Sequence, residues 1–229
     1  MKEGLIDKQI SNIKKVPDAI REYCKYEHPV DKIPLTGNVS IAKVTNVYQA
    51  LPYIDDVTDL LNSNLIESYD KQESSTLLRS ERILDDGRVL DNRSIWDGGA
   101  FLLFDEEKLI GASLAREEIL IIDKVRQNTG RGFGLFTVVD EEYRTGVWGI
   151  LLSGIAIDSL IRKGCDEVRG STSVHNKLAD KLFSRVAKGR WIEGEWVRYN
   201  VDKEKFITAF YSLLASRGLM EQYNLVFRQ

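Results

Sequence analysis

The sequence predicts an α/β (α+β) domain in which a central mixed β-sheet is flanked by helices. Between residues 133 and 186 the pattern runs strand, glycine-containing loop, helix, strand, helix, which is a crossover unit of a parallel or mixed sheet. Upstream, the apolar runs 101–104 and 109–115 are separated by a short polar turn, which predicts a β-hairpin. All four prolines lie within the first 52 residues, so the regular scaffold is expected after them.

The first third of the chain predicts an arm, a strand and two helices. Residues 1–37 are typical of a polar helix through about Arg21 followed by a proline-marked connector. Residues 38–45 alternate apolar and polar side chains, as a half-buried strand does. Helical spacing follows over residues 47–65, and a second, more polar helix is predicted over residues 73–84.

The middle of the chain predicts the core of the sheet. After the hairpin, the apolar stretch 119–122 leads into a polar, glycine-rich loop at 127–132. Residues 133–139 are β-rich and almost uninterrupted, which predicts a strand buried on both faces. The loop 140–149 then leads into an amphipathic helix that ends at Gly164.

The remaining elements complete the crossover unit and add a C-terminal extension. They are predicted as a strand at 167–171, a helix at 176–186, a strand or hairpin within 191–201, a helix at 203–216 and a short strand at 223–227. The expected organisation is therefore an N-terminal helical arm and connector over 1–37, a main domain over 38–201, and a C-terminal helix and strand packed on it over 202–229.

Composition excludes several classes of protein. The chain has 229 residues, 32 Lys+Arg and 35 Asp+Glu, and a net charge of -3, which argues against broad, salt-driven nucleic-acid binding. Cys24 and Cys165 lie too far apart in sequence for a metal-ligand motif, and two cysteines make no disulfide framework. No apolar run reaches the roughly 18–20 residues that span a bilayer, and the N-terminus lacks a signal-peptide core. We therefore expect a cytoplasmic protein with no membrane partner.

The loop from the buried strand into the helix at about residue 150 is the most informative segment. Such a loop exposes free backbone N–H groups at the positive end of a helix dipole, which can bind phosphate or pyrophosphate. Arg144 can add charge-assisted hydrogen bonds, while Gly146 and Gly149 allow close backbone approach. An ordinary βα turn with packing glycines explains the segment equally well.

A resemblance to a known family favours the phosphate-binding interpretation. Residues 137–152, TVVDEEYRTGVWGILL, resemble the acetyl-CoA motif of the GCN5-related N-acetyltransferase (GNAT) superfamily, V-x-P-x-Y-R-x-x-G-x-G, with Val139, Tyr143, Arg144 and Gly149 in matching places. Residues 164–168, GCDEV, and 176–183, NKLADKLF, resemble two later motifs of that family. The three motifs occur in the family's order and spacing, from about residue 99 to 200.

The resemblance implies a GNAT-like, strongly twisted sheet and acetyl-CoA as the cofactor. It implies that the backbone of Val138 and Val139 pairs with pantetheine and that Asn176 and Phe183 face the cofactor from the opposite side. The loop that would bind the pyrophosphate consists of Arg144, Thr145, Gly146, Val147, Trp148 and Gly149. No metal is implied.

Three positions depart from the family pattern. Val147 stands where the family prefers its first glycine, and its branched side chain narrows the loop. Glu141 replaces a proline. Phe183 stands where many members carry a tyrosine that is thought to protonate the departing thiolate, and a phenyl ring cannot donate a proton.

Catalytic candidates follow from what amine acetylation needs, namely an acceptor nitrogen that has lost its proton. We predict Glu118 and His175 as catalytic residues, with Glu117 and Asp140 as further candidates for the base. Tyr143 and Tyr199 are alternative proton donors.

The function predicted from these features is transfer of an acyl group from acetyl-CoA to a primary amine of a small molecule, such as an amino-sugar nucleotide, by direct attack in a ternary complex. Two alternatives stay open at this point. One is a degenerate fold that binds CoA or a partner without catalysis; the other is acetylation of a protein or nucleic-acid amine, with nucleic acid the least favoured. The sequence also leaves open whether the chain forms a homodimer.

Overall fold

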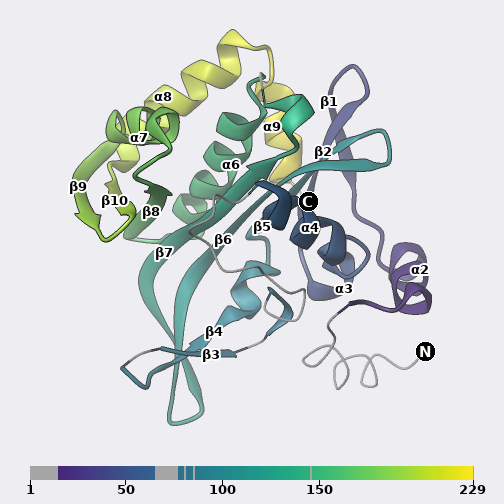
Figure 1. Ribbon diagram of the computed structural model, residues 1–229, viewed down its shortest axis with the longest axis horizontal. Helices are drawn as coiled ribbons and strands as arrows, with labels where there is room; N and C mark the ends of the chain where they lie inside the picture. The colour runs from purple at the N-terminus through teal and green to yellow at the C-terminus, as the bar shows by residue number, and fades with distance from the viewer. Residues whose placement is uncertain (1–14, 65–76, 80, 85, 145, 229) are drawn as a thin grey trace.

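The computed structural model describes residues 15–64, 77–79, 81–84, 86–144 and 146–228. Its centre is a mixed sheet with the strand order β1-β2-β5-β6-β7-β8-β10-β9 (Figure 1). Among the described strand pairs, only β7 and β8 run parallel. The predicted fold class, a mixed sheet flanked by helices, is therefore confirmed.

The strands of this path are β1 (Lys32–Thr36), β2 (Val39–Val44), β5 (Ala100–Asp105), β6 (Lys108–Ile122), β7 (Val125–Val139), β8 (Glu167–Ser173), β9 (Ala187–Glu193) and β10 (Trp196–Val201). Two short strands, β3 (Glu81–Ile83) and β4 (Val89–Asp91), pair with each other, and β4 also pairs with β6. A 3-10 turn, η1 (Asn92–Ile95), follows β4.

Helices cover both faces of the sheet (Figure 1). One face carries α2 (Asp18–Glu27), α3 (Val47–Ala50) and α4 (Ile54–Asn64), and the other carries α6 (Trp148–Arg162), α7 (Lys177–Ser184), α8 (Lys203–Ser216) and α9 (Met220–Val226). Strand β5 explains why both layers are needed. Its Leu102 belongs to the core on the α4 face and its Leu103 to the core on the α6 face, because successive side chains of a strand point to opposite sides.

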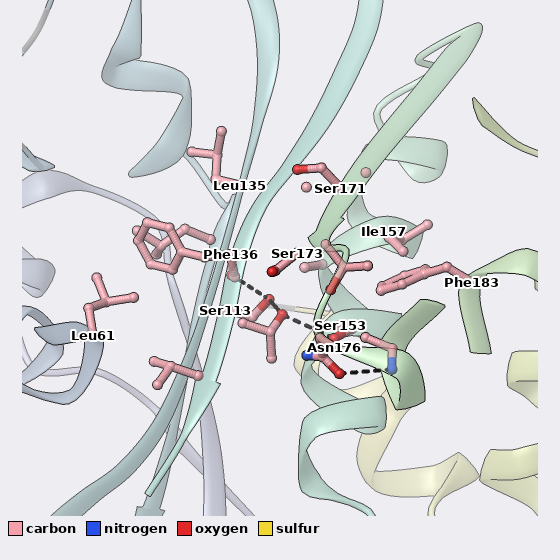
Figure 2. Close-up of a pocket in the computed structure, with 18 of the residues that line it drawn as sticks. Leu61, Ser113, Leu135, Phe136, Ser153, Ile157, Ser171, Ser173, Asn176 and Phe183 are labelled. Atoms are coloured by element: carbon pink, nitrogen blue, oxygen red, sulfur yellow. Dashed lines mark hydrogen bonds between the residues drawn. The ribbon is translucent and has the colours of Figure 1, made fainter. Parts of the chain in front are cut away.

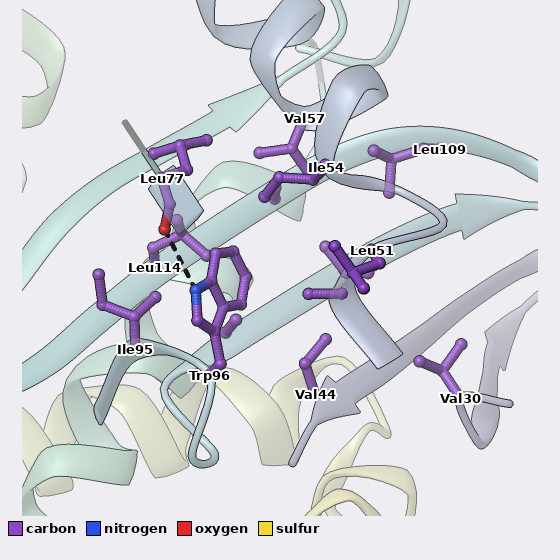
Figure 3. Close-up of a cluster of buried hydrophobic side chains, with 14 of the residues drawn as sticks. Val30, Val44, Leu51, Ile54, Val57, Leu77, Ile95, Trp96, Leu109 and Leu114 are labelled. Atoms are coloured by element: carbon purple, nitrogen blue, oxygen red, sulfur yellow. Dashed lines mark hydrogen bonds between the residues drawn. The ribbon is translucent and has the colours of Figure 1, made fainter. Parts of the chain in front are cut away.

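The core on the α4 face fixes the position of α4 against the sheet. Figure 3 shows Leu51, Ile54 and Val57 packed toward Leu114 and the ring of Trp96. The indole N–H of Trp96 donates to the carbonyl of Leu77 at 3.2 Å, so this buried polar group is satisfied.

The core on the α6 face depends on a close approach of helices. A Cβ at Gly154 of α6 would lie 2.1 Å from Cε2 of Phe210 in α8, so only glycine fits there. The buried carboxylate of Asp158 also accepts hydrogen bonds from Tyr223 of α9 and from Arg162. These contacts hold the C-terminal helices against α6.

Two predicted elements differ near the N-terminus. Residues 81–83, expected within a helix over 73–84, form β3, because they pair with β4; residues 73–76 lie outside the described range. Of the predicted arm, residues 1–14 also lie outside that range, and the helix α2 runs to Glu27 rather than ending near Arg21. Residues 32–36 of the expected connector form the edge strand β1. The division into domains stays a prediction.

Two further predictions are wrong in the second half of the chain. The expected loop 127–132 is part of β7, where pairing with β6 continues and Gly130 adopts a φ of +74°. The expected final strand 223–227 lies mainly in α9, because Leu219, Tyr223 and Val226 have helical spacing and all three are buried.

The close approach at Gly154 gives a stability prediction. We expect Gly154→Ala to lower the free energy of unfolding by about 1–3 kcal/mol, because the added methyl group would overlap the ring of Phe210. Urea denaturation followed by circular dichroism measures this. The control is Gly189→Ala, whose added Cβ would have its nearest neighbour, Cβ of Asn200, at 3.8 Å. Equal stability of the two variants would contradict the packing described.

Candidate active site

The site forms where β7 and β8 separate. The two strands pair only between residues 131–133 and 167–169, and beyond that point a cavity of about 200 Å³ lies between them (Figure 2). The separation begins next to a β-bulge at Leu135, since Leu114 faces Phe136 while Ala115 faces Gly134. A bulge bends a strand and increases its twist, which directs β7 away from β8.

The lining comes from both sides of the sheet. It comprises Leu61 and Asn64 of α4, Ser113 and Leu114 of β6, residues 134–138 of β7, Ser153, Ala156 and Ile157 of α6, residues 170–173 of β8, and Asn176, Ala179 and Phe183 at α7.

Two open strand edges face each other across this cavity. Residues 134 and 136–138 of β7 pair with β6, and residues 170–173 of β8 pair with β10. Among the described strands nothing pairs with their inner edges. Unpaired backbone N–H and C=O groups bind extended chains that carry amide groups, in the way that an added strand does.

Three hydroxyl groups form a continuous chain at one wall. Oγ of Ser113 lies 2.7 Å from Oγ1 of Thr137, and Ser153 of α6 donates to Thr137 at 3.0 Å (Figure 2). Ser153 also lies 2.7 Å from the carbonyl oxygen of Gly149. The chain ties the two strands to α6 and makes this part of the cavity polar.

The N-terminus of α6 lies at the end of β7. Gly149 lies in the first turn, and a Cβ there would be 3.9 Å from Val139, so the helix start and the strand end are adjacent. Arg144 donates from Nε to the carbonyl of Val139 at 3.3 Å and from Nη2 to Asn64 of α4. The arginine thus lies between the strand end and α4, beside free N–H groups of a 15-residue helix. Thr145 lies outside the described residues.

The opposite wall carries the predicted residues of α7. Asn176 caps this helix, with its Oδ1 accepting from the N–H of Ala179 at 3.1 Å, and its side chain borders the cavity. Phe183 also lines the cavity, and its ring centroid lies 5.5 Å from that of Tyr199. The structure therefore brings Val138, Asn176 and Phe183 to one cavity. Residues 144 and 146–149 lie at the adjoining helix start.

The two alternative proton donors are engaged elsewhere. Tyr199 is fully buried and donates to Asp180 at 2.6 Å; burial and this carboxylate raise the pKa of the phenol. Tyr143 donates to Asp105 at 2.6 Å, which raises the pKa of its phenol. Neither ring lines the cavity.

The predicted catalytic residues also lie outside the lining. Glu118 on β6 is 8% exposed and accepts from Thr129 at 2.8 Å, with Arg131 at 3.6 Å. His175 is exposed, and its backbone N–H donates to Ser173. The other two candidates for the base have cationic partners, Glu117 with Lys163 at 3.2 Å and Asp140 with Lys108 at 3.1 Å. A catalytic role for Glu118 or His175 stays a prediction.

Sequence reasoning missed several lining residues. The position of Ser153 could have been predicted from the sequence, because it follows Gly149 by one helical turn and therefore shares its side of α6. No sequence pattern predicts Ser113, Leu61 or Asn64, because only the tertiary packing of β6 and α4 brings them to the cavity.

Comparisons with known proteins agree on the type of enzyme. The chain is 22% identical over 148 residues to N-alpha-acetyltransferase 30 of Schizosaccharomyces pombe, which spans 65% of this chain and 85% of that protein. This relative confirms the resemblance to acetyltransferases. No family model matches the chain.

Similar solved structures include the NatC complex bound to Gag peptide and CoA, with 19% identity, 72% of this chain and 97% of that chain covered, and a TM-score of 0.48. Another is Arabidopsis thaliana Naa50 with the bisubstrate analogue CoA-Ac-MVNAL, with 14% identity, 72% and 97% coverage, and a TM-score of 0.44. A third is a putative acetyltransferase of the GNAT family from Desulfovibrio desulfuricans, with 12% identity, 71% and 98% coverage, and a TM-score of 0.48.

These findings correct one prediction. The expected small-molecule amine acceptor is wrong, since the curated relative is an N-alpha-acetyltransferase. Within the described ranges, no helix is long and apolar enough to cross a membrane.

The Asp180 contacts give a pH prediction. Hydrogen bonds from Arg190 and Tyr199 lower the pKa of Asp180 in the folded protein. The contribution of the Asp180 carboxylate to stability is therefore complete above its pKa in the unfolded chain, about 3.9, and is lost as the pH falls through its lower pKa in the folded protein. We expect the difference in melting temperature between the wild type and Asp180→Asn to be largest near pH 7 and to narrow below about pH 4. Tyr199→Phe, which keeps Arg190, should lose this stability at a higher pH than the wild type. A pH-independent difference would contradict the assignment.

Proposed function

We propose that this chain is an acetyl-CoA-dependent N-acetyltransferase that modifies the α-amino group of protein N-termini. The observation that carries the proposal is the pair of open strand edges that leads from a closed vertex to the N-terminus of α6. An extended pantetheine chain with amide groups suits the strand edge, and a pyrophosphate suits the helix start.

The residues at the site fit this cofactor. The backbone of Val138 and Val139 would pair with pantetheine, and Asn176 and Phe183 would face it from α7. At the helix start, Arg144 would give up its contact with Asn64 to pair with phosphate oxygens. The other predicted contributors are Gly146, Val147, Trp148 and Gly149 at the helix start, together with Thr145, which lies outside the described residues.

The lining of the cavity favours an acceptor of low basicity. Acetyl-CoA supplies a thioester whose acetyl group passes to a neutral amine. Among the described residues, no Asp, Glu or His side chain lines the cavity, so no base is placed there to remove a proton. A lysine amine has a pKa of about 10.4, whereas an α-amino group has one of about 7.7–8.0 and is partly neutral at physiological pH. The α-amino group therefore needs the least help to lose its proton, in agreement with the curated relative, an N-alpha-acetyltransferase.

Phe183 leaves the departing sulfur without a phenol donor. Tyr143 and Tyr199 both donate to carboxylates, so they do not replace it. A thiolate is a reasonable leaving group, and water in the polar cavity can protonate it while the chain positions the reactants.

A direct test offers peptides with free α-amino groups, and the same peptides with blocked N-termini and a free lysine. We expect release of CoA thiol only with free α-amino groups, and mass spectrometry should place the added acetyl group there. Binding of acetyl-CoA without transfer to any peptide would instead support a non-catalytic CoA-binding protein.

The cofactor contacts give a binding prediction. Arg144→Ala should weaken acetyl-CoA binding about 10- to 100-fold, because charge-assisted hydrogen bonds contribute roughly 1.5–3 kcal/mol. Gly149→Val should also weaken it, since a branched side chain would obstruct the helix start. Isothermal titration calorimetry measures both, with Arg217→Ala at the end of α8 as a charge-matched control. Unchanged affinity in both site variants would place the cofactor elsewhere.

The Phe183 position gives a separate prediction. Phe183→Tyr should fold normally and bind acetyl-CoA within about twofold of the wild type, because the residue lines a cavity that also holds several hydroxyl groups. Steady-state kinetics should show kcat maintained or increased, since a phenol can donate to the sulfur. Loss of cofactor binding would show that the phenyl ring itself is needed.

A further inference from the structure

One transverse row of the sheet places two arginines beside the vertex of the cavity. Arg116 of β6 pairs in register with Phe133 of β7, Phe133 with Arg169 of β8, and Arg169 with Asn200 of β10. This is the last row before β7 and β8 separate. Side chains in one register row point to the same face, so the two arginines flank Phe133, with their Cα atoms about 10 Å apart, twice the interstrand spacing.

Arg116 makes one hydrogen bond among the described residues. Its Nη1 donates to Oδ1 of Asn92 at 2.8 Å, but its Nε is inaccessible to solvent and has no hydrogen-bond partner. In the described part of the chain no carboxylate lies within 4.0 Å of this guanidinium, although Glu118 is close enough for its charge to act on it. Burial, together with repulsion from Arg82, lowers the pKa of Arg116 to about 10, while the charge of Glu118 opposes this shift. A half-buried cation in this state is stabilised by a bound anion.

Arg169 contributes a second guanidinium to this row. Its Nη2 binds both oxygens of Glu167 at 3.0 Å, while its Nε is buried without a partner. The neighbouring carboxylates are already engaged, since Arg131 lies 3.6 Å from Glu118 and 3.3 Å from Glu167. Among the described residues, ion pairs within 4.0 Å thus join these two glutamates to Arg131 and Arg169 but not to Arg116.

The row adjoins the cavity on the α4 face. Leu114, two residues from Arg116 on the same side of β6, lines the cavity, as do Gly134 and Gly170, the residues that follow Phe133 and Arg169. An acceptor whose amine enters the cavity from this face would place its neighbouring side chain over the row.

We propose that Arg116, assisted by Arg169, binds a carboxylate side chain near the N-terminus of the acceptor peptide. This rests on the proposed function and specifies the substrate class as acidic N-termini. The planar guanidinium of Arg116 would supply the charge and, through its terminal N–H groups, directed donors.

The test compares matched acceptor peptides that differ only by Asp against Asn, or Glu against Gln, at each of the first three positions. We expect wild-type kcat/KM to be about 10- to 100-fold higher for the acidic peptide at one position. Arg116→Gln should reduce that ratio to within about twofold, while the affinity for acetyl-CoA and the rate with the amide peptide stay within about threefold of the wild type. Arg217→Gln, at an exposed position at the end of α8, is the matched control and should keep the ratio.

The outcomes separate this inference from the proposed function. Acetylation of neutral peptides without an acidic preference, or a preference that survives Arg116→Gln, overturns the inference alone. Absence of acetylation of every peptide overturns the proposed function and the inference with it. If Arg116→Gln does not fold, Arg169→Gln decides: a lowered ratio supports the subsite, and an unchanged ratio overturns it.

Discussion

The separation of β7 and β8 after three paired residues is the constraint on which the rest of the site depends. Had the parallel pairing continued past Phe133 and Arg169, the strand edges would have satisfied each other and no cavity would exist. The bulge at Leu135 bends β7, while pairing with β10 holds β8 in place. Both strands stay anchored on their outer sides, so the open inner edges cost little stability and are left for a ligand.

The chemistry of the cavity follows from which elements border this gap. The α6 side supplies hydroxyl groups and a helix N-terminus, which suit a polar, anionic cofactor. The α4 side supplies apolar residues such as Leu61, with arginines just beyond them. Under the proposed function, this asymmetry would separate the two substrates by charge, with the phosphates at the helix start and the acceptor on the opposite face. Arg144 connects the sides through Asn64, so a loaded cofactor site would release a contact that reaches α4.

Local patterns predicted what local chemistry determines. The strands 38–45 and 101–115, the helix 203–216 and the loop at Arg144 were predictable, because apolar periodicity and turn residues specify them. The extension of β7 through 127–132 was not, since a polar, glycine-containing segment becomes a strand only through its long pairing with β6. The hydroxyl chain and the row of residues that contains Arg116 could not be predicted from the sequence either. Both depend on register between strands that are distant in the sequence, which composition and periodicity do not encode.

The described cavity lining, which holds no carboxylate or imidazole, and the position of Arg116 beside it fit one electrostatic scheme. A carboxylate beside an α-amino group stabilises the ammonium form, raises its pKa and so removes the neutral amine that must react. A cavity without a base would therefore disfavour acidic N-termini. Pairing that carboxylate with Arg116 cancels its charge and returns the amine toward its ordinary pKa of about 7.7–8.0. The same arginine would thus hold the acceptor and keep its amine reactive.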